Sequence, residues 1–434
     1  PPKPLKPGEW APREGVPVLL LPGIGGAVDT VRAAGTGLSR YGGLLLILLL
    51  TAAVYSGSLD NSFHYDDAHS IVENVHLRSL ANIPSFFHDP AMFSVWGDRS
   101  MYRPLLLTSY ALNFAAGGYE VRGYHLLNLG IHLLVVVLIF AIGRTAGGAV
   151  AGSLGAAAVF ALHPVNAEAV NYISSRSESL ATLCYLAALL AYLRWRQSGT
   201  GLFSRYYLLA LVAFAGGLLS KSIAVTLPVC LALAELCLPA LPGRRCTWRL
   251  LARWHAAFWL IAAAYLLAVR QAVGAALVDA PARGLGEQLM TQAKAVVYYL
   301  QLLALPVRLT VEHQFFPAAS GSTVAVGCAA VAAVSLAWLL VRRRRRDMAT
   351  LAAGAAALSL MPSLLVPLNV LVNEHRLYPA FALLCGLGLS RWGGAGSTRA
   401  TVAVLVAAAG IGGLLSQQRN AVWADELSLW RDAV

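Results

Sequence analysis

The stretch "YGGLLLILLLTAAVYSGSLDNSFHYDDAH", from Tyr41 to His69, decides the fold because it joins an apolar segment to two adjacent acids. The apolar part, about residues 41–59, is long enough for a membrane-spanning helix. Asp66 and Asp67 follow it in a chain of which only 12% of the residues are charged. Neighbouring carboxylates repel each other, so water, a cation or a substrate proton must compensate them. Which of these does so depends on the side of the membrane that the pair faces.

Apolar runs of this kind recur throughout the 434 residues, and 58% of the residues are hydrophobic. Because soluble proteins carry about twice this charged fraction, the composition excludes an ordinary soluble globular protein. We therefore predict an all-α polytopic membrane protein with about eleven transmembrane helices. The predicted spans lie at about residues 41–59, 124–143, 147–162, 170–193, 206–220, 223–241, 255–270, 322–341, 348–368, 378–390 and 400–416.

The charges of the loops predict the orientation of these spans. Residues 1–40 are rich in proline, glycine and basic residues and contain no apolar run long enough to span, so we predict a cytoplasmic tail. With this tail inside, arginines collect in the inner loops, most densely from Arg342 to Arg346, as the positive-inside rule requires. The net charge of +12 then reflects cytoplasmic loops, and we expect no binding to nucleic acid.

One apolar segment, from Thr291 to Leu309, is long enough to cross the membrane but does not fit this orientation. If it crossed, Arg342 to Arg346 would lie outside, against the positive-inside rule. We predict instead a re-entrant or interfacial helix within a late outer loop. The transmembrane domain then covers residues 41–416, and residues 417–434 form an outward-facing C-terminal segment.

The outer loops collect most of the acids and several polar side chains that are unusual beside a membrane. Ionisable groups at membrane depth are costly and commonly functional. Acids together with Lys, Arg and His at one lipid–water boundary fit a site that binds an anionic headgroup while a carboxylate handles a proton. Besides the two aspartates, the candidates are Tyr102, Arg103, His163, Glu168, Arg176, Lys221, His313, Glu374, His375 and Arg376.

Each candidate also has a purely structural interpretation. Lys221 alone could extend to the membrane interface, and Glu168 and Arg176, two helical turns apart, could form an ion pair. His163, before a proline, could cap a helix, and the aspartate pair could be a solvated turn. A lone histidine such as His313 is more often structural than catalytic. The functional interpretation gains weight because all five outer loops carry such groups, whereas the inner loops hold mainly arginine.

Seven segments occur in a characteristic order: "FHYDDAHSI", "YRPL", "GYHLLNLGIHLL", "HPVNAEAVNYISSRSE", "LLSKSIAVTLP", "LPVRLTVEH" and "NEHRLYPA". Together they resemble the transmembrane-and-tetratricopeptide O-mannosyltransferase-like family over about residues 41–432. That family belongs to the GT-C superfamily of polyprenyl-phosphate-sugar-dependent glycosyltransferases, so the resemblance implies a GT-C-like bundle with a long first outer loop. No repeat with a period near 34 residues is visible. Recognition of an acceptor by tetratricopeptide repeats would therefore need a separate or accessory chain.

The resemblance also implies roles for the outer-face residues. Asp66 or Asp67 would be the catalytic aspartate that accepts the proton of the acceptor hydroxyl. Lys221, His313, His375 and Arg376 match the positions of a lipid-phosphate site. The remaining candidates, Tyr102, Arg103, His163, Glu168, Arg176 and Glu374, are assigned to substrate binding or to support of the site.

No metal is obligatory on this interpretation, because the resemblance implies none and no Cys/His cluster indicates a zinc site. The adjacent aspartates leave the use of a divalent cation open.

The predicted function is transfer of a sugar from a polyprenyl-phosphate donor to a hydroxyl of a protein Ser/Thr or a glycan, with inversion, on the outer face. The chain shows no phosphate-cradling glycine loop for a nucleotide sugar. The alanine- and arginine-rich composition suggests a bacterial inner membrane with the active face in the periplasm or outside the cell.

Two alternatives belong to other classes: a transporter or flippase of polyprenyl-linked sugars, and a non-catalytic membrane scaffold. A transporter requires ionisable residues near the middle of its spans. The predicted span centres hold almost only Ala, Leu, Val and Gly apart from a few residues such as His132, which disfavours transport.

Overall fold

The computed structural model describes residues 41–434 except 98–100, 239–247, 279–282, 319–325, 328–346, 367–368 and 393–398. Leu44–Val434 form one compact unit, and a second unit, Pro1–Gly43, is described only at residues 41–43. The predicted tail 1–40, most of the predicted span 322–341 and the arginines from Arg342 to Arg346 lie outside the described residues. The orientation in the membrane therefore stays a prediction.

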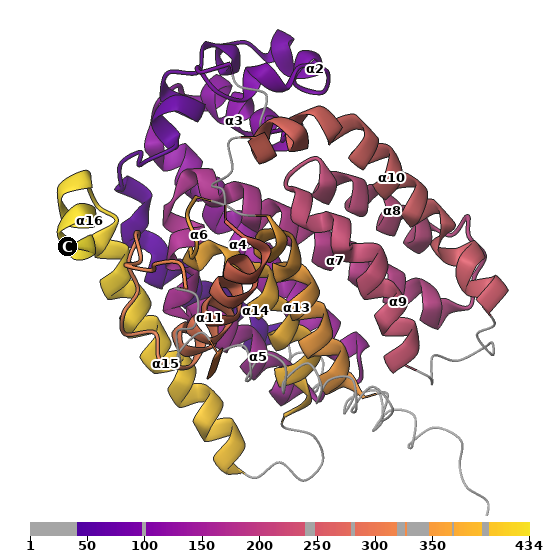
Figure 1. Cartoon of the computed structure of the whole chain (residues 1–434). Helices are drawn as coiled ribbons and strands as arrows, with labels where there is room; N and C mark the ends of the chain where they lie inside the picture. Colours follow the sequence, from indigo (N-terminus) through magenta and orange to yellow (C-terminus); the bar gives the residue numbers. More distant parts are fainter. Residues whose placement is uncertain are drawn as a thin grey trace, which may run out of the picture. The chain divides into compact units, whose positions relative to one another are not determined.

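The described residues form helices and turns, and no β-strand occurs among them (Figure 1). This confirms the predicted all-α class. In chain order the α-helices are α2 (Ile83–Phe86), α3 (Pro104–Gly117), α4 (Val121–Thr145), α5 (Val150–Leu162), α6 (Ala167–Asn171), α7 (Arg176–Ser198), α8 (Arg205–Leu218), α9 (Leu227–Cys237), α10 (Trp248–Val278), α11 (Leu285–Ala304), α13 (Met348–Leu365), α14 (Leu377–Leu383), α15 (Arg399–Val422) and α16 (Glu426–Ala433).

Five of the described helices are long and apolar enough to cross a membrane. A sixth span results if two helices joined by a bend of 53°, Val150–Leu162 and Pro164–Asn171, count as one. The chain is thus a multi-pass membrane protein, but eleven spans are not confirmed. The five are Tyr41–Asp60, Val121–Thr145, Leu251–Ala272, Met348–Leu365 and Ala400–Val422, and two shorter apolar helices are Arg205–Leu218 and Ser222–Cys237.

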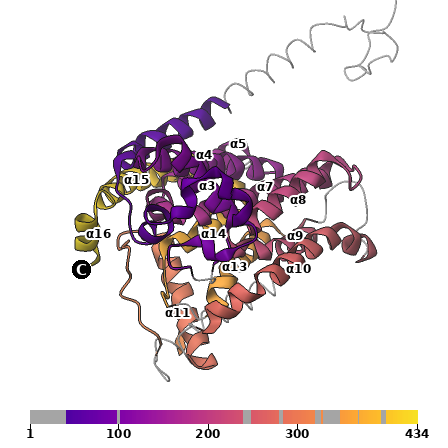
Figure 2. The same cartoon turned by 90° about the horizontal axis from the view of Figure 1, so that it is seen from above.

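Close packing of helices explains several glycines of the membrane segments. Helix α7 packs along both α8 and α4, and α15 packs along α5 (Figures 1 and 2). A Cβ atom at Gly152 in α5 would lie 1.8 Å from the Trp392 carbonyl oxygen, and one at Gly412 in α15 would lie 2.7 Å from the Leu162 carbonyl oxygen. Small residues let helix backbones approach in membrane proteins, so these two positions require glycine.

The predicted span at 170–193 begins later than expected. Helix α6 ends at Asn171, a short turn follows at Ile173–Ser175, and α7 begins at Arg176. The fully buried guanidinium of Arg176 fixes this start, because it donates to the Asn128 side chain at 2.6 Å and to the Tyr124 carbonyl at 3.0 Å. The resulting break exposes polar groups of the turn to the site described below.

The segment predicted as re-entrant or interfacial is helical, since α11 covers Leu285–Ala304. It is not one of the five described helices that are long and apolar enough to cross a membrane. Its position relative to the lipid stays a prediction.

Candidate functional site

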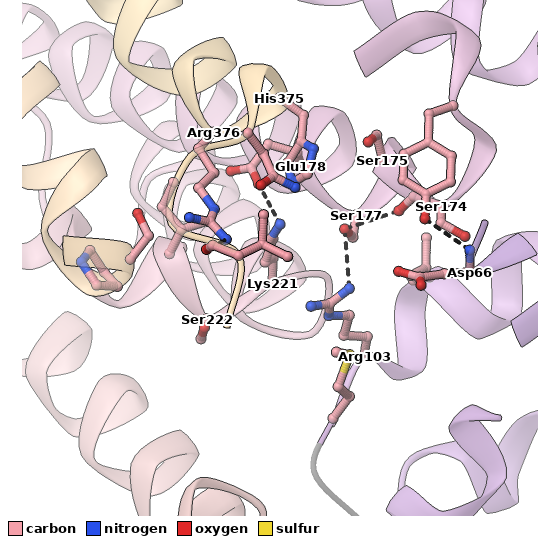
Figure 3. A pocket seen from close by; sticks show the side chains of 18 of the residues that line it. Asp66, Arg103, Ser174, Ser175, Ser177, Glu178, Lys221, Ser222, His375 and Arg376 are labelled. Carbon is pink, nitrogen blue, oxygen red and sulfur yellow. Dashed lines mark hydrogen bonds and ion pairs between the residues drawn. The ribbon is translucent and has the colours of Figure 1, made fainter. Parts of the chain in front are cut away.

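A cavity of about 560 Å³ brings together residues that are far apart in the sequence (Figure 3). It is bordered by the first loop, the start of α3, the turn before α7, the segment after α8 and the loop before α14. The charged or titratable side chains among its lining residues are Asp66, Arg103, Glu178, Lys221, His375 and Arg376, together with Tyr110 and Tyr172.

The two adjacent aspartates face different surroundings. Asp67 is fully buried, and its Oδ1 accepts hydrogen bonds from the Ser174 amide at 2.8 Å and the Ser174 hydroxyl at 2.5 Å. Its Oδ2 accepts one from the amide of His64 at 3.0 Å. Burial raises the pKa of the Asp67 carboxyl to about 6, although these hydrogen bonds oppose the shift. Asp67 thus ties the first loop to the turn before α7.

Asp66 lines the cavity, and its side chain is 60% exposed. Its Oδ1 lies 3.4 Å from the Nε2 atom of His69, one helical turn further along the chain. The hydrogen bond from His69 lowers the pKa of the Asp66 carboxyl below its usual value. Asp66 is therefore an ionised carboxylate at neutral pH that is open to a substrate.

Three of the residues predicted for a phosphate site, Lys221, His375 and Arg376, line the same cavity as Asp66. The Lys221 ammonium lies 2.5 Å from the carboxylate of Glu178, which is in the first turn of α7. A carboxylate is favoured there by the helix dipole. The carboxylate of Glu168 fixes the position of His375. It accepts a hydrogen bond from the His375 backbone amide at 2.8 Å, and its second oxygen lies 2.8 Å from the His375 Nδ1 atom.

Two arginines of the cavity have no carboxylate partner in the described part of the chain. Arg376 donates to the carbonyls of Leu371 and Val370, and Arg103 donates to the Ser177 hydroxyl at 3.3 Å. Guanidinium groups without a bound carboxylate are suited to bind a phosphate group in two-pronged fashion. Figure 3 shows Arg103 between Asp66 on one side and the Lys221–Arg376 group on the other.

Other predicted residues lie behind the cavity and do not line it. His313 contacts the Tyr298 hydroxyl at 2.9 Å through Nδ1, and its Nε2 lies 3.4 Å from the buried carboxylate of Glu374. Glu374 also accepts from the Thr310 amide at 2.7 Å. Burial raises the pKa of the Glu374 carboxyl. These residues brace the loop that carries His375 and Arg376.

The remaining predicted residues make local contacts. The interpretation of His163 as a helix cap is confirmed, since its ring accepts from the Val165 amide at 3.2 Å. The Tyr102 hydroxyl donates to the Phe87 carbonyl at 3.0 Å. The proposed ion pair between Glu168 and Arg176 is wrong, because Glu168 binds His375 and Arg176 binds neutral oxygens.

Among the described residues, no group of three or more His, Cys, Asp and Glu side chains is arranged to hold a metal ion. The carboxylates of Asp66 and Asp67 do not converge on a common position, because Asp66 borders the cavity and Asp67 is buried in contact with Ser174.

Comparison with curated proteins finds similarity to protein O-mannosyltransferases. The chain is 37% identical over 150 residues to protein O-mannosyl-transferase Tmtc1 of Drosophila melanogaster, which is 33% of this chain and 17% of that protein. Tmtc2 of the same organism is 35% identical over 191 residues, covering 41% and 20% of the two chains. Human TMTC3 is 31% identical over 158 residues, covering 35% and 17%.

The resemblance seen in the sequence is confirmed. The matched region spans about a fifth of the length of these O-mannosyltransferase relatives. No family model matches the chain, and no solved structure does.

Two residues that contact the predicted site residues have no role predicted from the sequence. They are Glu178, which pairs with Lys221, and His69, which pairs with Asp66. The ion pair of Glu178 joins positions 43 residues apart, for which no local spacing gives a signal. His69 has a signal, because positions i and i+3 lie on one face of a helical turn and its partner is Asp66.

Proposed function

We propose that this chain is a membrane glycosyltransferase that moves a sugar from a polyprenyl-phosphate donor to a hydroxyl of an acceptor protein. The observation that carries the proposal is a single cavity with an ionised carboxylate, Asp66, on one side and the cations Lys221 and Arg376 on the other. The similarity to proteins named O-mannosyltransferases supports the reaction class and favours a protein Ser/Thr as acceptor.

The cations bind the phosphate of the donor. In this reaction the bond between the anomeric carbon and the phosphate oxygen breaks, and the leaving phosphate keeps the electron pair. Lys221, Arg376 and Arg103 stabilise the negative charge that develops on it. Glu168 orients His375 beside them through two contacts of 2.8 Å.

Asp66 acts as the general base for the acceptor. It takes the proton of the hydroxyl as the oxygen attacks the anomeric carbon from the face opposite the phosphate, so the configuration inverts. Its lowered pKa keeps it ionised at neutral pH, and its exposure lets an acceptor reach it. Asp67 holds the loop in place through His64 and Ser174.

The active face is proposed to lie outside the cytoplasm, because the predicted inner loops hold the arginine clusters. For a chain from a bacterium, this is the periplasmic or extracellular face of the inner membrane.

Replacement of Asp66 tests the proposal. Purified protein is given a panel of polyprenyl-phosphate sugars and Ser/Thr peptides, and transfer is followed by mass spectrometry. We expect Asp66→Asn to lower the transfer rate about 10²- to 10⁴-fold, as for loss of a positioned general base, with donor binding retained. Asp60→Asn is the matched control, because Asp60 is 69% exposed and pairs with Arg122 away from the cavity. Equal rates for Asp66→Asn and wild type would contradict the proposal.

A further inference from the structure

The segment that follows the last candidate span packs onto the first loop, immediately before the aspartate pair. In Figure 1 α16 lies beside the loop that follows the helix Tyr41–Asp60. The amide and the hydroxyl of Ser62 both contact the Ala424 carbonyl oxygen, at 3.2 and 3.1 Å. A capping box between Asp425 and Ser428 fixes the start of α16. The contact therefore has a defined geometry.

His64 is at the centre of this contact. Its side chain is fully buried, its Nε2 lies 2.8 Å from the Trp423 carbonyl oxygen, and its Nδ1 lies 3.1 Å from Oε1 of Glu426. The two ring nitrogens therefore face two hydrogen-bond acceptors, a carbonyl and a carboxylate, on opposite sides of the ring. Together these contacts fix the orientation of the His64 ring.

The same contact reaches both aspartates. The amide of His64 donates to Asp67 at 3.0 Å. Trp423 is fully buried and stacks on Tyr172, with 5.9 Å between ring centroids, and the Tyr172 hydroxyl accepts from the amide of Asp66 at 3.1 Å. The turn is thus held from two sides.

Backbone strain shows why the turn needs outside support. Tyr65 is the non-glycine residue with positive φ in the described chain, at 50°, and it directly precedes Asp66. Such a conformation is costly and persists where surrounding contacts enforce it. The ring of Tyr65 lies 5.1 Å from that of Trp430 in α16, so α16 also contacts the strained residue.

We infer that the segment Trp423–Ala433 is a positioning element for the catalytic aspartate and that it acts through the side chain of His64. This inference rests on the proposed function. Neither His64 nor Glu426 touches the substrate, and both act by fixing the backbone from which Asp66 projects. A partner or a chain segment that displaces α16 would lower the rate of transfer without occupying the cavity.

Acidic groups gather around this contact. Glu426 and Asp425 face His64 from the N-terminal end of α16, and Asp67 faces it from its own turn. Glu426→Gln keeps the shape of the side chain and a hydrogen-bonding group but removes the charge, so it tests how far the contact depends on the carboxylate.

The test compares kcat and KM of wild type, His64→Gln and Glu426→Gln. We expect His64→Gln to lower kcat about 10- to 100-fold while KM for the donor changes little, as for a misplaced catalytic group. We expect Glu426→Gln, which keeps a hydrogen-bonding side chain at this position, to lower kcat less than His64→Gln does. His88→Gln, an exposed histidine in the same loop, is the matched control. A wild-type kcat in His64→Gln would overturn the inference.

Hydrogen exchange separates failure of this inference from failure of the proposed function. Amides of residues 62–70 should exchange faster in His64→Gln than in wild type, whether or not a transfer assay works. Unchanged exchange would overturn the positioning role by itself. Wild-type protein that transfers no sugar, with the exchange difference present, would contradict the proposed function and leave the contact established.

Discussion

Helix α7 carries an ion pair near each end, and the two pairs differ in their surroundings. At its start, Glu178 pairs with Lys221, whose side chain is 20% exposed and borders the cavity. Near its end, Arg196 pairs with Glu235, and both side chains are less than 10% exposed. The second pair is closed by the Tyr192 hydroxyl at 2.7 Å and by the Trp254 ring, 4.1 Å from the guanidinium.

The different exposure of the two ion pairs indicates different roles. A buried ion pair with satisfied geometry holds helices in register, and removal of one partner leaves a charge in a medium of low dielectric constant. The Glu178–Lys221 pair has the same chemistry, but one partner keeps access to a cavity in which a phosphate can compete for it. We therefore propose that the first pair takes part in donor binding and that the second pair stabilises helix packing.

Among changes to the two ion pairs, the largest effect on transfer is expected for Lys221→Met. Loss of the ammonium removes one of the groups that stabilise the leaving phosphate, so we expect transfer to fall about 10²- to 10³-fold. Lys294→Met is the control, because Lys294 is in α11 and its ammonium donates to the Phe316 carbonyl outside the cavity. Initial rates with both variants decide the assignment. A Lys221→Met variant with more than half the wild-type rate would contradict a role of Lys221 in the site.

Arg196→Met should affect stability and not chemistry. Removing the guanidinium from the buried Glu235 carboxylate is expected to cost about 3–5 kcal/mol of unfolding free energy. The rate per folded molecule should stay near that of wild type. Thermal unfolding in detergent measures the loss, and a second change, Glu235→Leu, should restore much of it. A variant of full stability but low kcat would reverse the comparison of the two pairs.

Glu178→Gln should have a smaller effect and the opposite sign. Without this carboxylate, Lys221 no longer exchanges an intramolecular partner for the phosphate, so KM for the donor should fall about two- to five-fold. Titration of the donor at constant acceptor concentration gives this value. A large increase in KM would mean that Glu178 itself contacts the donor.

The smallest effect concerns Asp67 and pH. Because the pKa of its carboxyl is raised to about 6 in the fold and is lower in the unfolded chain, the folded state binds more protons between these values. This carboxyl therefore contributes stability below its unfolded pKa, and that contribution is lost as pH rises to about 6. The slope of the unfolding midpoint between pH 4 and 6 should flatten in Asp67→Asn. If the slope is unchanged in this variant, groups other than Asp67 cause the pH dependence of stability.

The sequence predicted the all-α membrane class because apolar runs carry that signal directly. It also led to three residues that line the cavity, Lys221, His375 and Arg376, since each stands at the end of an apolar run. It could not separate the roles of Asp66 and Asp67, because their different burial depends on Ser174, more than 100 residues later. The sequence also does not determine the number of spans, because short or bent apolar helices are hard to distinguish from full spans by length alone.

The contact between His64 and Glu426 could not be predicted from the sequence either, because it is a long-range contact. It joins positions 362 residues apart, and neither residue is unusual in its local sequence.

The position of a bound donor analogue tests the central claim most directly. A non-transferable polyprenyl phosphonate sugar can be located in a cryo-electron microscopy map of the protein in lipid nanodiscs. We predict that the phosphonate lies within hydrogen-bond distance of Lys221, Arg376 or Arg103, with the anomeric carbon on the side of Asp66. A phosphonate bound elsewhere, or a sugar directed away from Asp66, would contradict the account.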